Sequence, residues 1–290
     1  MMKKIIICAL AAVLGLSACA PKEQEAKVLA RPVPERMDDF VFENNLIAGR
    51  FYGEAIEGNP TSPGIDIWVK LPGKLVANEW YAAATGEGGD PDYYHRNHDG
   101  KDCYKVSVSL GGGGSVPYIG GQLCFPPTNY RASEIVEQTP EKVVFTLSYP
   151  EWTVGEVAVS LVKKVTVEAD TYFCKVEDVY TFNGAESIDV AAGIFRHPTQ
   201  GTIKEEKTTA KAYAIWENAS DQSIEPEDGM LGVAVAAPEA DSVIVTEDQT
   251  HGLCIKNVKS GETFTYYYGS CWSKGDVKTA ADWFALVEQL

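Results

Sequence analysis

Short runs in which apolar and polar residues alternate with a period of two dominate this chain. Such runs, rich in Val, Thr, Tyr and Phe and interrupted by turn residues, predict antiparallel strands that each bury one face. No helical pattern of ten residues alternates with them, so a parallel α/β fold is not expected. The sequence predicts an all-β fold, a large antiparallel β-sandwich. The predicted strands span residues 40–42, 65–69, 104–108, 143–149, 157–167, 172–182, 191–195, 210–216, 231–237, 242–246 and 264–268.

Two segments between these runs have the composition of tight turns. Asn183-Gly184 predicts a two-residue hairpin, and residues 259–262 (Lys-Ser-Gly-Glu) predict a second turn. Only the C-terminus has a helical pattern, in which Thr279 and Asp282 form a capping box with Asp in place of Glu. Apolar residues follow this box, so we expect a short C-terminal helix that covers a sheet edge or end.

The first residues are typical of an export signal. Lys3 and Lys4 precede an apolar stretch over residues 5–16, which is shorter than the roughly 20 residues of a membrane-spanning helix. The following Leu-Ser-Ala-Cys resembles the lipobox of bacterial lipoproteins, which implies cleavage before Cys19 and acylation of its thiol. We expect a protein anchored by lipid to the bacterial outer membrane, on its periplasmic or cell-surface face. A plain secretory signal is the alternative.

Three parts of the chain are therefore expected. Residues 1–18 form the lipoprotein signal peptide. Residues 19–38 form a lipid-anchored flexible tether, because they are rich in charge, Ala and Pro and have no sustained period. Residues 39–290 form a single β-sandwich domain, because they contain no internal repeat and no long linker.

The net charge changes the expected partners. With 41 acidic and 25 basic residues the chain carries a formal charge of -16, which excludes a general nucleic-acid binder. The loss of Lys3 and Lys4 with the signal peptide makes the protein more negative still. An anionic ligand therefore requires cations gathered in one place, and we expect such a basic patch near His95 and His98.

The cysteines do not define a disulfide framework or a zinc site. None of those after the signal has C-x-x-C spacing. A bridge between Cys103 and Cys124 would close the glycine-rich stretch between them, and buried free thiols are the alternative. The five cysteines after residue 19 are Cys103, Cys124, Cys174, Cys254 and Cys271.

Residues 80–114 concentrate the groups that carry chemistry. His95 and His98 lie there with Asp102 and several tyrosines, and histidine is the side chain that exchanges protons near neutral pH. Turn residues surround the histidines, so we expect a loop on a rigid sheet, a common position for catalytic groups. A surface loop whose Asp and Asn side chains cap turns is the alternative.

No cofactor is predicted. A divalent metal could bind His95, His98 and Asp99, but H-x-x-H on a loop is a weak pattern. The acidic residues do not have calcium-loop spacing, and the glycines at 111–114 are not followed by the Lys-Ser/Thr of a phosphate-binding loop.

Several motifs in order resemble domain-of-unknown-function family 4861. They are FENNLIAGRFYG at 42–53, GIDIWVK at 64–70, Tyr94-His95 with Gly100, Asp102, Tyr104, Lys105 and Val106, and YYYGSCWSKGD at 266–276 with Trp283. The resemblance covers residues 39–290. It departs from the family pattern at 139–142, where Thr-Pro-Glu-Lys replaces a strand start that contains arginine.

The resemblance implies a galactose-mutarotase-like β-sandwich, or supersandwich, and a place in the breakdown of acidic polysaccharides. Some members are thought to be lyases, so the expected function is a carbohydrate-active enzyme that dehydrates or splits uronic-acid-containing oligosaccharides by elimination. Its partners would be an acidic oligosaccharide and, through the lipid anchor, the membrane. A non-catalytic carbohydrate-binding lipoprotein, a mutarotase-like epimerase and a glycoside hydrolase are the alternatives.

Elimination next to a uronate carboxylate requires a base for the C5 proton, an acid for the leaving oxygen and a group that neutralises the carboxylate. The catalytic candidates are His95 or His98 as the base, Tyr104 or Tyr94 as the acid, Asp102 to orient a histidine, and His197 as a second catalytic histidine. The substrate-binding candidates are Arg50, Lys70, Arg196 and Lys274 for the carboxylate, and Trp68 and Trp272, with Trp80 and Tyr81, for stacking on sugar rings. For these aromatic residues a place in the core is the alternative.

Overall fold

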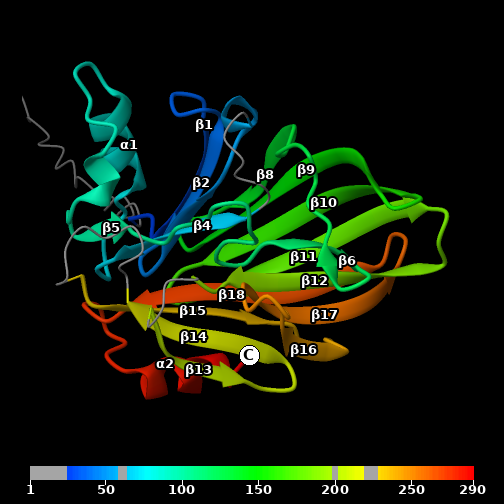
Figure 1. Ribbon diagram of the computed structural model, residues 1–290. Helices are drawn as coiled ribbons and strands as arrows, with labels where there is room; N and C mark the ends of the chain where they lie inside the picture. The colour runs from blue at the N-terminus through cyan, green and yellow to red at the C-terminus, as the bar shows by residue number, and fades with distance from the viewer. Residues whose placement is uncertain (1–24, 58–63, 198–201, 219–227) are drawn as a thin grey trace, which may run out of the picture.

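Three antiparallel sheets make up most of the described chain, residues 25–57, 64–197, 202–218 and 228–290 of the computed structural model (Figure 1). The first sheet consists of β1 (Val28–Val33), β2 (Asp39–Asn44), β3 (Ala48–Phe51), β4 (Ile65–Lys70) and β5 (Gly100–Asp102), paired in chain order. The second has the order β13 (Ile203–Thr208), β14 (Ala212–Asn218), β15 (Met230–Ala236), β18 (Thr263–Trp272), β11 (Phe173–Asn183), β10 (Val157–Glu168), β9 (Lys142–Val154), β8 (Ala132–Gln138). The third has the order β16 (Ser242–Val245), β17 (His251–Lys259), β12 (Ser187–Phe195), β6 (Ser115–Ile119), β7 (Gln122–Leu123).

The main hydrophobic core draws residues from all three sheets. Along β9, β10 and β11 buried and less buried positions alternate, as the period of a strand requires. The rings of Phe40 and Phe145 lie 4.4 Å apart and join the first sheet to the second, and Phe42 meets Tyr268 edge-on at 5.8 Å. The predicted all-β antiparallel sandwich is confirmed.

Two predicted turns carry the chain from one sheet to another. The hairpin predicted at Asn183-Gly184 is wrong, because β12 pairs with β17 and β6 and does not return along β11. The turn at residues 259–262 forms, with the amide of Glu262 donating to Lys259 O at 3.0 Å, and it likewise connects two sheets. Local composition predicts that the chain turns at these two positions. The sheet in which the next strand pairs depends on the part of the hydrophobic core that this strand covers.

The strand predicted at residues 104–108 does not form. After β5 the chain leaves the first sheet and crosses towards β12, where the amide of Phe195 donates to Gly111 O at 2.8 Å. The glycines at 111–114 permit this close crossing, since a Cβ on Gly113 would lie 2.3 Å from Cβ of Tyr268.

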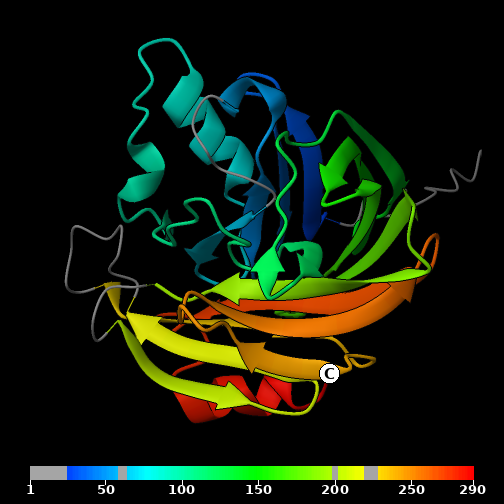
Figure 2. The same ribbon diagram turned by 45° about the vertical axis from the view of Figure 1, so that its right-hand side comes forward.

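The described residues contain one α-helix that the sequence did not indicate. α1 (Ala77–Thr85) lies against the first sheet (Figure 2). Its Trp80 and Tyr81 side chains pack on that sheet. The carboxylate of Glu43 caps its start by accepting from the amides of Val76 at 2.6 Å and Ala77 at 2.9 Å. This cap comes from β2, so no local capping signal exists in the sequence.

The C-terminal helix is confirmed. α2 (Ala280–Val287) begins at Thr279, whose side chain accepts from the amide of Asp282. The helix lies beside β14 and β13 at the edge of the second sheet (Figure 1). Its apolar residues, including Trp283, pack against β14 and β15.

The predicted tether over residues 19–38 is wrong from Val28 onward. Val28–Val33 forms β1, pairs along its whole length with β2 and buries Val28 and Val33. Cys19 and the predicted signal peptide lie outside the described residues. Within the part of the chain that the structure describes, no helix has the length and apolar character needed to cross a membrane.

A charged pair lies inside the sandwich. Lys163 Nζ is 2.6 Å from Asp178 Oδ2 and 2.9 Å from the hydroxyl of Tyr266, and both charged side chains are fully buried. Burial raises the pKa of Asp178 and lowers that of Lys163, while each partner opposes the shift of the other. The pair therefore depends on both members being present.

We expect Lys163→Met to lower the free energy of unfolding by about 3–5 kcal/mol, because it leaves Asp178 buried without its cation. The double variant Lys163→Met, Asp178→Leu should recover most of this loss. Urea denaturation measures both. Lys164→Met is the control, since that exposed lysine pairs with Glu177 at the surface. Equal effects of the Lys163 and Lys164 substitutions would contradict the interpretation.

Candidate active site

Arg50 of β3 is the centre of a buried ionic cluster. Its Nε lies 2.7 Å from Asp66 Oδ2, and its Nη2 lies 2.9 Å from Asp102 Oδ2. Asp39 of β2 approaches Nε at 3.8 Å. These side chains come from four neighbouring strands and are almost completely buried. Arg50 therefore holds β5 against the sheet, and three carboxylates already surround its charge.

Aromatic rings enclose the same guanidinium. Its carbon lies 5.3 Å from the ring centres of Trp68 and Tyr94 and 5.5 Å from that of Tyr52. Trp68 is fully buried and stacks on Tyr94 at 5.9 Å. Trp68, Trp80 and Tyr94 thus belong to the core on this side of the first sheet, where Trp68 and Tyr94 stabilise a cation.

The cluster contains three carboxylates and two guanidinium groups, so one negative charge is not balanced. Asp39, Asp66 and Asp102 face Arg50 and Arg36, which pairs with Asp39 at 2.9 Å. Loss of solvation raises the pKa of Asp102 to about 7, with a further contribution from Asp66, although Arg50 opposes the shift. A proton on Asp102 would remove the excess charge, and the loss of solvation shifts the pKa of this carboxyl in that direction.

His95 is held in one tautomer beside this cluster. It ends the short 3-10 helix η2 (Tyr93–His95), and its Nδ1 lies 3.1 Å from the backbone oxygen of Asp102. A carbonyl oxygen only accepts, so in the neutral imidazole Nδ1 carries the hydrogen and Nε2 keeps a lone pair. The ring is half-buried, and no hydrogen bond from Nε2 to another described residue is present. His95 is thus prepared to accept a proton.

His98 has a different environment on the same loop. Its ring stacks face to face on Tyr93 with centres 3.9 Å apart, and its Nε2 is buried without a hydrogen-bond partner among the described residues. The cations nearby are Arg96 and Lys74, which pair with Asp90 and Asp99 at the surface. The expected basic patch is therefore neutralised pair by pair around this loop.

His197 forms the second histidine centre, just after β12. Its Nδ1 lies 2.8 Å from Glu217 Oε1 of β14, and its Nε2 lies 2.9 Å from the backbone oxygen of Lys105. Both partners are acceptors, so the imidazole and the carboxyl together hold two protons, as imidazolium with carboxylate or as neutral imidazole with carboxylic acid. The pair is buried, and a proton lies between Nδ1 and Glu217 Oε1.

A four-residue segment, 102–105, connects the two histidines. The carbonyl of Asp102 orients His95, and the carbonyl of Lys105 orients His197. Between them the hydroxyl of Tyr104 donates to Phe195 O at 2.8 Å, and its ring meets His197 edge-on at 4.6 Å. Burial raises the pKa of Tyr104 well above its usual value. Tyr104 thus positions His197, and its hydroxyl keeps its proton and donates it in a hydrogen bond to a backbone carbonyl.

Beyond this segment the ends of β15 and β18 add further groups. Lys101 Nζ lies 2.6 Å from Asp228 Oδ2, and Trp272 Nε1 donates to Asp228 O at 2.7 Å. These three residues are buried. Lys274 is exposed, with its ammonium 5.0 Å from the ring centre of Trp272. Trp272 thus supports a surface cation and is not itself open to a sugar ring.

The other predicted carboxylate-binding cations already have partners. Lys70 is fully buried and lies 2.6 Å from Glu43 Oε1. Arg196 Nη2 lies 2.9 Å from Glu206 Oε2, and its Nη1 donates to Gln249. Lys105 is exposed and forms no ion pair with the described residues.

Glu217, Lys101, Lys105 and Asp228 were not among the residues selected from the sequence. Glu217 and the Lys105 carbonyl meet His197 across 20 and 92 residues of chain. Only Lys105 had a signal, its place in the Tyr104-Lys105-Val106 motif. In the described ranges no group of three or more His, Cys, Asp or Glu side chains could hold a metal ion. The five cysteines after residue 19 are free thiols.

Comparisons with known proteins identify one matching family. The sequence matches the family described as "Domain of unknown function (DUF4861)" over residues 16–290. It is 28% identical over 276 residues to "Uncharacterized protein P7" of Formosa agariphila, a match that covers 90% of this chain. The chain spans 66% of the length of that relative.

A solved structure with some similarity is the GH36 alpha-galactosidase AgaB from Geobacillus stearothermophilus. The likeness has a TM-score of 0.39 and 9% identity, and covers 84% of this chain and 41% of that one. A likeness at this level carries no argument about function.

The pKa of Asp102 predicts a pH-dependent stability. An aspartate in the unfolded chain titrates near about 3.9, and the folded value is about 7. Between these values the folded protein binds more protons, so this group lowers the free energy of unfolding as the pH rises, by at most about 1.4 kcal/mol per pH unit. Urea denaturation from pH 4.5 to pH 7.5 measures the slope.

Asp102→Asn removes this titrating group and should flatten the slope. Asp276→Asn is the control, since Asp276 is exposed and lies outside the cluster. Identical slopes for the wild type and Asp102→Asn would contradict the assignment of the proton to Asp102.

Proposed function

The chain belongs to the DUF4861 family, and from this premise we propose that it is a carbohydrate-active enzyme of the carbon–oxygen lyase class. Its substrate is an acidic oligosaccharide that contains uronic acid, and its reaction is a dehydration or a β-elimination. The substrate class comes from the resemblance of the chain to its family. The reaction type comes from the two histidine centres.

The proposal rests on one observation. The segment 102–105 holds His95 in the form of a general base and the His197–Glu217 pair in the form of a general acid. The Asp102 carbonyl leaves His95 with an open lone pair, the form that a general base requires. The Lys105 carbonyl and Glu217 keep a proton in the other pair, the form that a general acid requires. Elimination uses these two forms in one step.

The proposed step conserves atoms and electrons. His95 Nε2 takes the C5 proton of the uronate, and the C5–H electron pair becomes the C4–C5 double bond as the C4–O bond breaks. The leaving oxygen takes a proton from the His197–Glu217 pair. It departs as water in a dehydration and as the hydroxyl of a sugar in a β-elimination.

Lys105 is the cation that we assign to the uronate carboxylate. It is exposed and lies in the segment that orients both histidines, whereas Arg50 and Lys70 already face carboxylates of the protein. Lys274 is exposed as a second cation over Trp272. A cation near C6 stabilises the negative charge that develops when the C5 proton leaves.

We also propose that the protein is anchored by lipid on Cys19 in the bacterial outer membrane, facing the periplasm or the cell surface. The lipobox-like Leu-Ser-Ala-Cys supports this location. An exported position would bring the enzyme to oligosaccharides released from polysaccharides outside the cytoplasm.

We expect His95→Gln and His197→Gln each to lower kcat by about 10²–10⁴-fold, since each removes a proton-transfer group. The assay incubates the protein with uronate-containing oligosaccharides and follows products by mass. His98→Gln is the matched control on the same loop and should keep most of the activity. Added imidazole should partly restore His95→Ala, whose half-buried site it can enter.

The same assay separates the alternatives. Addition of water across the cleaved bond indicates a hydrolase, an isomer of unchanged mass an epimerase, and binding without product a carbohydrate-binding lipoprotein. Any of these outcomes would overturn the lyase proposal. Loss of activity in His98→Gln with full activity in His95→Gln would overturn the assignment of the base.

We expect Cys19→Ala to move the protein from the membrane fraction to the soluble exported fraction, because the variant has no thiol for acylation. Fractionation of the bacterium with detection of the protein measures this. Ser17→Ala is the control, since it keeps the cysteine. Equal membrane association of wild type and Cys19→Ala would contradict the lipid anchor.

A further inference from the structure

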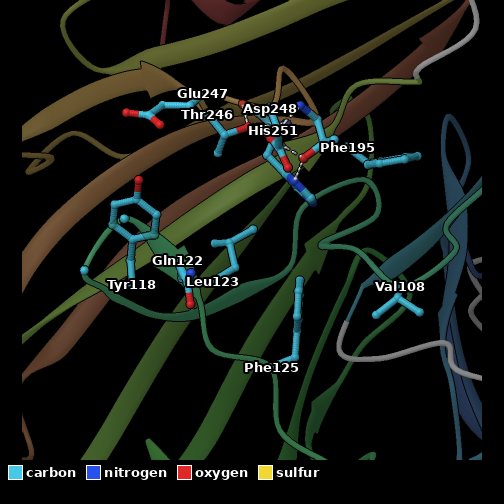
Figure 3. A pocket seen from close by; sticks show the side chains of 13 residues that line it. Val108, Tyr118, Gln122, Leu123, Phe125, Phe195, Thr246, Glu247, Asp248 and His251 are labelled. Atoms are coloured by element: carbon cyan, nitrogen blue, oxygen red, sulfur yellow. Dashed lines mark hydrogen bonds between the residues drawn. The ribbon is translucent and has the colours of Figure 1, made fainter. Parts of the chain in front are cut away.

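A pocket of about 670 Å³ lies over the third sheet (Figure 3). Its walls are the β6–β7 hairpin with the segment that follows it, the end of β12 and the turn between β16 and β17. Its volume falls within the range of about 300–1,000 Å³ of small-molecule sites. The proton-transfer step described above uses none of its side chains.

Aromatic side chains form two sides of the pocket. Tyr118 and Phe125 stand on one side, and Phe195 stands beside the turn on the other (Figure 3). Tyr118 and Phe125 are part-exposed, and the Tyr118 hydroxyl makes no hydrogen bond to any described residue. Part-exposed rings with a free hydroxyl suit the apolar face of a pyranose and one of its hydroxyls.

The polar side of the pocket consists of acceptors. Asp248 Oδ1 accepts from the Thr246 hydroxyl at 2.6 Å and from the Thr250 amide at 3.1 Å, which fixes the carboxylate in the turn. Glu247 beside it is exposed. The described residues that line the pocket include no lysine or arginine. Such walls repel an anionic sugar and accept hydrogen bonds from neutral hydroxyls.

His251 closes the inner end as an uncharged group. The amide of Leu110 donates to its Nε2 at 3.3 Å, so Nδ1 carries the hydrogen and donates to the Thr250 hydroxyl at 2.8 Å. Burial lowers the pKa of His251 to about 4, so this ring adds no positive charge near neutral pH.

We propose that this pocket binds a neutral, hydroxyl-rich pyranose unit. Its ring would lie against Tyr118 and Phe125, with its hydroxyls donating to Asp248 and Glu247. The ring of Phe195 lies 5.2 Å from that of His197 and 5.4 Å from that of His251, so the pocket borders the proposed active site. If the ligand is a neutral unit of the oligosaccharide on which the proposed enzyme acts, this inference rests on the proposed function.

Imidazole NMR signals test the pocket without turnover. The chain has four histidines, so the His251 signal can be assigned with His251→Gln. The probes are a uronate-containing disaccharide and its carboxyl-reduced, neutral counterpart. We expect the neutral probe to shift the His251 signal in a saturable way, with a Kd at least about tenfold lower than the uronate probe has at this signal.

Pocket variants locate the binding. Phe125→Ala and Glu247→Gln should each weaken binding of the neutral probe at least threefold, and Glu239→Gln, an exposed acid elsewhere, should leave it unchanged. An unshifted His251 signal at millimolar neutral probe, or tighter binding of the uronate probe there, would overturn the inference. A His251 shift with no product from any acidic oligosaccharide would overturn the proposed function and leave the pocket assignment standing.

Discussion

The buried ion pair between Arg50 and Asp102 is the interaction on which the proposed site depends. β5 is only three residues long and pairs with β4 alone, so few backbone hydrogen bonds hold it. The ion pair, at 2.9 Å and shielded from water, attaches its last residue to β3. The following segment, 103–105, leaves the sheet from a fixed point. Burial of this pair, together with the neighbouring carboxylate of Asp66, raises the pKa of Asp102.

Because Asp102 is fixed in place, the segment that begins there orients one histidine at each of its ends. The Asp102 carbonyl reaches His95, and three residues later the Lys105 carbonyl reaches His197. A backbone carbonyl thus orients one ring nitrogen of each histidine, and the Glu217 side chain binds the other nitrogen of His197. Tyr104 attaches the middle of the segment to β12 through Phe195 O. The proposed base is therefore positioned by backbone, and the proposed acid by backbone together with Glu217 and Tyr104, which supports proton transfer without large rearrangement.

Much of the fold could be predicted from local sequence, because alternation decides which face of a strand is buried, as in β9, β10 and β11. Features that depend on distant partners could not. Glu43 caps α1 from β2, and Tyr104 donates to a carbonyl 91 residues away, so the predicted strand at 104–108 becomes a crossing segment. The same limit applies to the site. His95 and Asp102 were visible in one loop, whereas the partners of His197 lie 20 and 92 residues away.

Proton NMR of the reaction product tests elimination most directly. Treatment of a uronate-containing oligosaccharide with the wild-type protein should remove the C5 proton signal and produce one vinylic signal from C4. Retention of the C5 proton in every product would contradict the account, whether the sugar is hydrolysed or unchanged.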